Sequence, residues 1–170
     1  MLPVDTETPE YPGRIFAPTE ACAPALPLPR VGTVLAFDFG EQRIGVAVGE
    51  LELRIAHALE VIAAVPTVER YRAVERLVSE WRPILLAVGL PSRPDGLSHP
   101  VADLCRKFAR SLEGRFRIPV ALVDERLSSA AASRALGETG IHGRAQKPHL
   151  DAAAAAQILA SFFSEIDARA

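Results

Sequence analysis

The chain has 170 residues, which is enough for one well-buried domain and too few for two substantial ones. Of these residues 49% are hydrophobic and 24% charged, which is typical of a globular protein. No apolar run is long enough to span a bilayer, no secretory signal opens the sequence, and its two cysteines make no disulfide framework, so we expect a cytoplasmic protein without a membrane partner. The net charge of −2 does not indicate a nucleic-acid binder, but residues 101–150 hold nine Lys/Arg against five Asp/Glu. That local excess is either a phosphate-contacting face or an ordinary solvated helix surface.

The first 30 residues differ in character from the rest. They contain seven of the fourteen prolines and show no hydrophobic periodicity. We therefore predict a disordered proline-rich arm over residues 1–30 and one folded domain over residues 31–170.

The folded part opens with strands. Two short apolar runs, residues 33–39 and 44–48, flank a turn around Gly40 and predict a β-hairpin. Residues 57–64 can supply a third strand. Apolar residues then recur at helical spacing over residues 68–81, and this helix stops before Pro83.

The second half alternates strands and helices. We predict a fully buried strand at 84–88, a helix from 101 to about 114, and a strand at 118–123. A helix capped by Ser128 follows to about residue 138, and an alanine-rich helix with Pro148 in its first turn runs to about residue 166. This order predicts an α/β fold with a mixed five-stranded sheet flanked by helices.

Asp38 is the most informative polar residue. Side chains alternate along a strand, so Asp38 shares a face with Val34 and Ala36 at the end of an apolar run. A buried carboxylate is costly unless it is paired or bound to a metal. The alternative is a strand-end aspartate that accepts hydrogen bonds from turn amides near Gly40.

Two further acidic sites could join it. Asp124 and Glu125 end the fifth predicted strand, and alternation allows at most one of them to lie beside Asp38, without saying which. Asp151 opens the last helix among small apolar residues, where an acid also suits the helix dipole. Carboxylates from two strand ends and one helix suit Mg²⁺ or Mn²⁺, whereas the four scattered histidines do not predict zinc.

Four ordered segments resemble the YqgF (RuvX) family. The first is Val-Leu-Ala-Phe-Asp-Phe-Gly from Val34, continued by Arg43 and the strand after it. The others are Val-Gly-Leu-Pro from Val88 with the later Asp-Gly, Asp-Glu-Arg-Leu-Ser from Asp124, and Lys147 with Asp-Ala-Ala-Ala from Asp151. Together they cover residues 33 to about 165. Departures from the family pattern are Ala131 in place of a glutamate and His149 in place of a basic residue.

The resemblance implies an RNase H-like fold and a metal-dependent endonuclease that processes the 5′ end of pre-16S rRNA in ribosome biogenesis. It implies Asp38, Glu125 and Asp151 as catalytic, metal-binding acids for Mg²⁺ or Mn²⁺, and it favours Glu125 over its neighbour. It also implies Arg43, Arg126 and Lys147 as nucleic-acid contacts, with precursor rRNA as the partner. The sequence leaves a monomer and a homodimer both open.

Three other functions remain open at this level. A Holliday junction resolvase acting on branched DNA would use the same chemistry and would need dimer symmetry. A ribosome-assembly factor could keep the fold without catalysis. An ATP-binding domain of the actin and sugar-kinase type also opens with Asp-x-Gly on a hairpin, but it needs two such domains around the nucleotide.

Overall fold

The computed structural model describes residues 28–63, 66–91, 95, 97, 99–125 and 147–169. These residues form one five-stranded sheet in the order β3-β2-β1-β4-β5. The strands are β1 (Thr33–Phe39), β2 (Ile44–Glu50), β3 (Ile55–Ile62), β4 (Leu85–Leu90) and β5 (Val120–Asp124), and the helices are α1 (Thr67–Trp81), α2 (Ala102–Phe116) and α4 (Lys147–Arg169). The predicted α/β class and mixed five-stranded sheet are confirmed.

The sheet combines two kinds of pairing. The first three strands form an antiparallel meander, whereas β4 and β5 run parallel to β1. The C-terminal ends of β1, β4 and β5 therefore lie at the same end of the sheet. Asp38 lies near this end of β1, and Asp124 and Glu125 lie at this end of β5.

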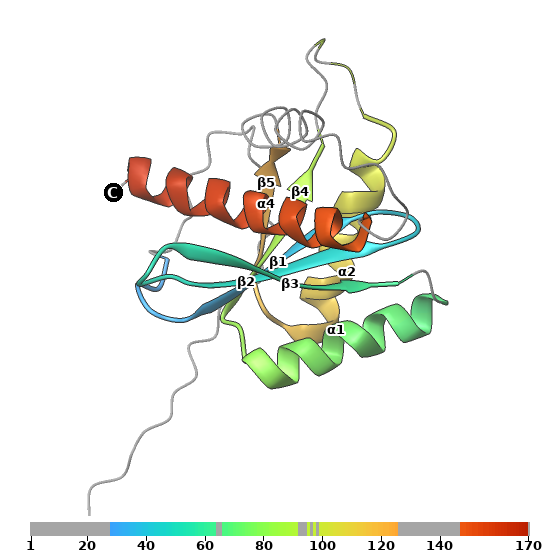
Figure 1. Ribbon diagram of the computed structural model, residues 1–170, viewed down its shortest axis with the longest axis horizontal. Coiled ribbons are helices and arrows are strands. Elements are labelled where there is room, and N and C mark those ends of the chain that lie inside the picture. The colour runs from blue at the N-terminus through green and yellow to red at the C-terminus, as the bar shows by residue number, and fades with distance from the viewer. Residues whose placement is uncertain are drawn as a thin grey trace, which may run out of the picture.

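Helices cover both faces of the sheet (Figure 1). Helices α1 and α2 pack on one face over Leu35 and Phe37, and α4 packs on the other over Val34 and Ala36. All residues of β4 are buried, as predicted for a strand covered on both sides. Alternating apolar residues of β1 thus serve two separate cores, and Asp38 falls on the α4 side of the sheet.

Several predicted boundaries shift by two residues, for local reasons. The β3 strand starts at Ile55 instead of residue 57 because Ile55 pairs with Glu50 across a four-residue turn closed by Arg54 at φ 55°. The last strand starts at Val120 instead of residue 118, because Pro119 has no amide hydrogen and takes part only through its carbonyl, which accepts a bond from Leu86.

The helix ends also move. Helix α2 continues past Gly114 to Phe116, where Arg117 adopts the left-handed conformation. Helix α4 ends at Arg169, three residues beyond the predicted end, and Pro148 lies in its first turn, as expected. The helix predicted over residues 128–138 and nearly all of the predicted N-terminal arm lie outside the described residues. In the part of the chain that is described, no helix is both long and apolar enough to cross a membrane.

Candidate active site

Asp38 lies one residue before the end of β1, on the face covered by α4. Burial raises the pKa of its carboxyl group from 3.8 to about 6, and the negative charge of Asp151 adds to this rise. The turn amide of Gly40 donates to the carbonyl of Arg43 at 2.8 Å, which closes the predicted hairpin turn without Asp38. The turn-capping alternative for Asp38 is therefore not what the structure shows.

Asp151 reaches Asp38 because β2 carries a glycine at the critical position. Gly45 is the register partner of Asp38 across the β1–β2 ladder. A Cβ atom on Gly45 would lie 1.9 Å from the backbone carbonyl oxygen of Asp151. The missing side chain lets the start of α4 rest directly on the sheet, and the close approach places Asp151 beside Asp38.

Glu125 is placed by a second glycine. It follows the last residue of β5, and a Cβ atom on Gly89 of β4 would lie 2.4 Å from its Oε1 atom. Burial raises the pKa of Glu125 to about 7, with smaller contributions from the charges of Asp38 and Asp124. Of the two adjacent acids it is thus Glu125 that occupies the α4 face, while Asp124 ends β5 in register with Leu90.

These positions form one row across the sheet. Asp38 pairs with Gly45 on one side, and because Phe37 pairs with Val88 on the other, the next position along β4 is Gly89. Asp38 therefore lies between two glycines, with Asp151 over the first and Glu125 over the second. Three carboxylates from three separate segments therefore lie along this row.

Of the three predicted nucleic-acid contacts, the structure describes the side chain of Arg43 alone. Arg43 Nε lies 3.9 Å from Asp151 Oδ2, with about a third of each side chain exposed. It provides positive charge beside the acids, and at this exposure the pair contributes little to stability. Lys147 is the first residue of α4, but its side chain lies outside the description, as does all of Arg126.

The donor chemistry of the row fits a hard divalent cation. All three groups are carboxylates, and the pKa values of Asp38 and Glu125 are raised by burial and by the charges of neighbouring carboxylates. Among the described residues no three such side chains are gathered closely enough to enclose a metal. Mg²⁺ does not require enclosure, because it keeps several waters and binds through one or two carboxylates plus phosphate oxygens.

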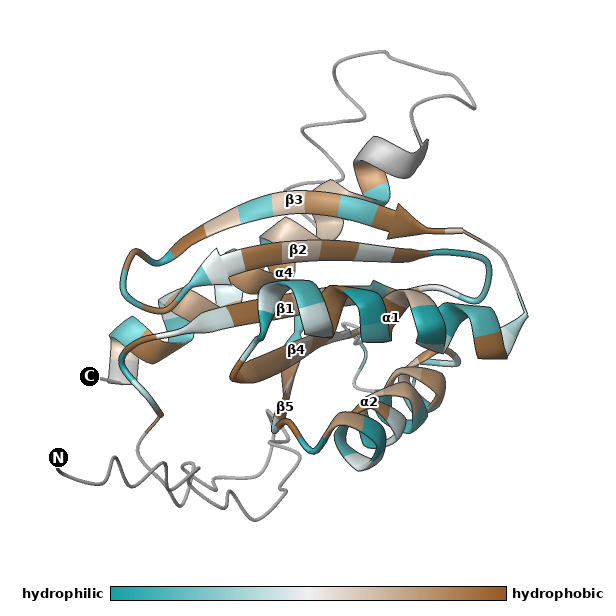
Figure 2. Ribbon diagram, turned by 90° about the horizontal axis from the view of Figure 1, so that it is seen from below, coloured by the Kyte–Doolittle hydropathy of each residue, from teal (hydrophilic) through white to brown (hydrophobic). Residues whose placement is uncertain are grey.

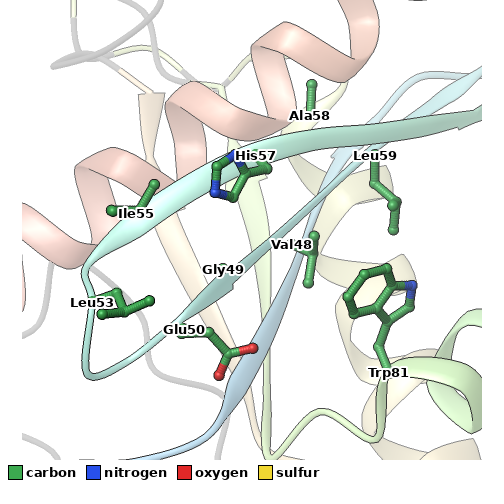
Figure 3. Close-up of a pocket in the computed structure, with 9 residues that line it drawn as sticks. All are labelled: Val48, Gly49, Glu50, Leu53, Ile55, His57, Ala58, Leu59 and Trp81. Carbon is green, nitrogen blue, oxygen red and sulfur yellow. The ribbon is translucent and has the colours of Figure 1, made fainter.

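A hollow of about 270 Å³ lies at the other end of the sheet (Figure 3). It is lined mainly by apolar side chains of β2 and β3, and Trp81 from the end of α1 forms one wall. Its lining residue Glu50 pairs with Thr33, at the opposite end of β1 from Asp38. This hollow is separate from the acidic row.

Sequence reasoning did not assign a role to Gly45 or Gly89. A glycine inside a strand does carry a signal, since it often marks a close approach of another backbone or a ligand. The two glycines flank Asp38, one on each neighbouring strand. The strand register that places them there is visible only in the folded sheet.

Comparison with known proteins identifies the family of the chain. The profile of a family described as RuvX, Holliday junction resolvase, matches residues 32–165. The chain belongs to the RuvX family. The matched range covers every described strand and all three acids of the row.

Curated relatives of this RuvX chain share about half of its residues. It is 58% identical over 132 residues to a protein of Methylobacillus flagellatus, a match that covers 78% of this chain and 90% of the relative. A protein of Nitrosomonas europaea is 53% identical over 132 residues, covering 78% of this chain and 89% of the relative. Both carry the name "Putative pre-16S rRNA nuclease".

The fold of this RuvX chain has a counterpart among solved structures. RuvC of T. thermophilus, determined in complex with a Holliday junction substrate, matches with a TM-score of 0.52 and 22% identity, covering 82% of this chain and 98% of that chain. At this identity the match establishes the fold, and the predicted RNase H-like class is confirmed.

Proposed function

We propose that this RuvX protein is a metal-dependent endonuclease that cleaves precursor 16S rRNA near its 5′ end, in the cytoplasm. The observation that carries the proposal is the row of acids, with Asp38 held between Glu125 and Asp151 by two glycines. The RNA substrate is supported by the names of the relatives that are 53–58% identical to this chain.

Asp38, Glu125 and Asp151 would hold Mg²⁺ or Mn²⁺. When bound, the cation would supply positive charge for a phosphodiester oxygen and for an attacking water. Asp38 lies at the centre of the row and would be the shared ligand, with Glu125 and Asp151 completing the set on either side. Because the pKa of Glu125 is raised to about 7, its carboxyl group is half protonated at pH 7 and takes the fully charged, metal-binding form only in alkaline solution.

The remaining polar groups would position the substrate. Arg43 approaches the row from the β1–β2 turn, where its guanidinium can donate to a phosphate next to the scissile bond. Lys147 opens the helix that carries Asp151, and Arg126 follows Glu125 directly. Arg126 is thus adjacent in sequence to one proposed metal ligand, and Lys147 lies one helix turn before another. We propose both as further phosphate contacts.

A second candidate function is cleavage of branched DNA. It is supported by the description of the family profile. The chemistry would be the same, so the two functions differ in substrate and in the need for a symmetric dimer to cut two strands.

One experiment separates these functions. Purified protein and its Asp38→Asn variant are incubated with precursor 16S rRNA and with a four-way DNA junction, with and without Mn²⁺. We expect Mn²⁺-dependent cleavage of the rRNA that is lost in the variant. Cleavage of the junction alone would establish the second function, and normal 16S 5′ ends in cells carrying Asp38→Asn would contradict a catalytic role and favour an assembly factor.

A further inference from the structure

Helix α2 exposes a stripe of positive charge. Lys107, Arg110, Gly114 and Arg117 are all exposed. The first three follow one another at intervals of three and four residues, so they share one side of the helix, and Arg117 follows at the left-handed C-cap. We call these four residues the α2 stripe.

The charges of the stripe are not neutralised by neighbouring acids. Within the described residues no carboxylate pairs with Lys107, Arg110 or Arg117. Of the acids on α2, Asp103 pairs with Arg106 at 3.0 Å, and Glu113 has a buried Oε1 atom that does not reach the surface. The helix therefore presents a run of three positive charges to solvent.

The neighbouring helix shows that this pattern is not general. Helix α1 lies beside α2 on the same face of the sheet (Figure 2). Its exposed side alternates in sign, with Arg72 and Arg76 among Glu69, Glu75 and Glu80, and Arg76 pairs with Glu80 at 3.4 Å. Such alternation is typical of a solvated helix surface, and the α2 stripe lacks it.

Helix α2 begins at the end of the sheet where the acidic row lies, and the stripe starts one and a half turns later on the exposed side of the helix. Helix α2 follows β4, packs against β4 and β5, and starts at the sheet edge where Asp38 and Glu125 lie. Cys105, in the first turn of α2 and on its buried side, is close enough to the acids for the charges of Glu125 and Asp38 to add to the rise that burial causes in its pKa, which is about 12. From Lys107 to Arg117 the stripe extends about 15 Å at 1.5 Å per residue.

We propose that the α2 stripe binds the phosphodiester backbone of the nucleic-acid strand that is cut at the acidic row. This inference rests on the proposed function and adds the path of the substrate over the surface. Each strand of a duplex carries one charge per about 3.4 Å of helix axis, so about four phosphates of one helical strand would face the stripe along its length. Phosphate contacts of this kind set the register of the strand without reading its sequence.

The test uses two matched double variants. The first, Arg110→Gln with Arg117→Gln, removes two stripe charges. The control, Arg72→Gln with Arg82→Gln, removes two charges from α1. Each pair contains one exposed arginine inside a helix and one exposed arginine at a left-handed helix end, with φ of 54° at Arg117 and 45° at Arg82.

Binding is measured by fluorescence anisotropy of labelled precursor 16S rRNA between 50 and 200 mM salt. All proteins carry Asp38→Asn so that the RNA stays intact, and circular dichroism verifies folding. We expect the stripe variant to bind roughly tenfold more weakly near 100 mM salt, and its slope of log affinity against log salt to fall by about 1.4, two contacts at about 0.7 each. The control should match the parent.

Equal affinities of the two double variants would overturn the stripe proposal. The proposed function would still stand if the protein with Asp38 intact cleaves the RNA. If the parent binds neither RNA nor the four-way DNA junction, the proposed function fails together with the stripe. A selective loss of junction binding in the stripe variant would support the stripe and move the substrate to DNA.

Discussion

Replacement of Asp38 by Asn should stabilise the fold at alkaline pH. In the absence of metal, burial and the charge of Asp151 make the ionised Asp38 carboxylate unfavourable, and its pKa is about 6 in the folded protein against 3.8 as the ordinary value. Since the folded state holds the proton more tightly, this group contributes most to stability below pH 4. The contribution is lost as the pH rises through 6.

The size of the effect follows from the shift in pKa. About two units correspond to about 3 kcal/mol at 1.36 kcal/mol per unit, which is an upper limit because the side chain is partly open to solvent. After screening, we expect Asp38→Asn to raise the free energy of unfolding by about 1–2 kcal/mol at pH 8 and to leave it nearly unchanged at pH 4.

Urea unfolding in EDTA at pH 4, 5, 6 and 8 measures this difference. Glu75→Gln is the matched control, because Glu75 is an exposed carboxylate on α1, and its replacement should change stability by less than about 0.5 kcal/mol at every pH. The reasoning is refuted if Asp38→Asn destabilises the protein at pH 8, or if its effect is the same at pH 4 and pH 8.

The two glycines beside Asp38 give contrasting predictions. Gly45→Ala should destabilise the protein by about 3 kcal/mol in urea unfolding, because its Cβ atom would meet backbone of Asp151 and α4 must move away. Gly89→Ala should lower the free energy of unfolding by only about 1 kcal/mol, because the added Cβ atom meets the flexible ends of the Glu125 and Ile158 side chains. It should nevertheless lower the cleavage rate about a hundredfold, because it displaces the Glu125 carboxylate. An unchanged rate would show that Glu125 is not a ligand. Mn²⁺ affinity, followed by calorimetry, should fall from pH 8 to pH 5.5 as Glu125 and Asp38, with pKa values of about 7 and 6, take up protons, whereas constant affinity would argue against these ligands. Gly114→Ala is a control that meets nothing within 4 Å and should stabilise α2 by about 0.5–1 kcal/mol.

Much of this architecture could be predicted from local pattern. The alternation in β1 assigned Asp38 to the face of Val34 and Ala36, and the apolar run of β4 indicated a strand covered on both sides. These signals are strong because each depends only on side-chain period and burial.

Other features depend on contacts between distant segments. Alternation alone could not choose between Asp124 and Glu125, since the choice depends on where β5 ends relative to Gly89. In the same way, Gly45 matters because α4, more than a hundred residues later, rests on it. The excess of positive charge was visible in the composition of residues 101–150, but that the exposed Lys107 and Arg110 share one side of α2 depends on the helix and its burial.

The most direct test of the metal-site proposal is Mn²⁺ binding followed by electron paramagnetic resonance. Wild-type protein, Asp38→Asn, Glu125→Gln and the control Glu75→Gln are titrated at pH 8. We predict that wild type and control bind Mn²⁺ equally, and that either acid replacement weakens binding at least tenfold. Equal binding by all four proteins, or RNA cleavage that persists in EDTA, would contradict a metal site built on Asp38.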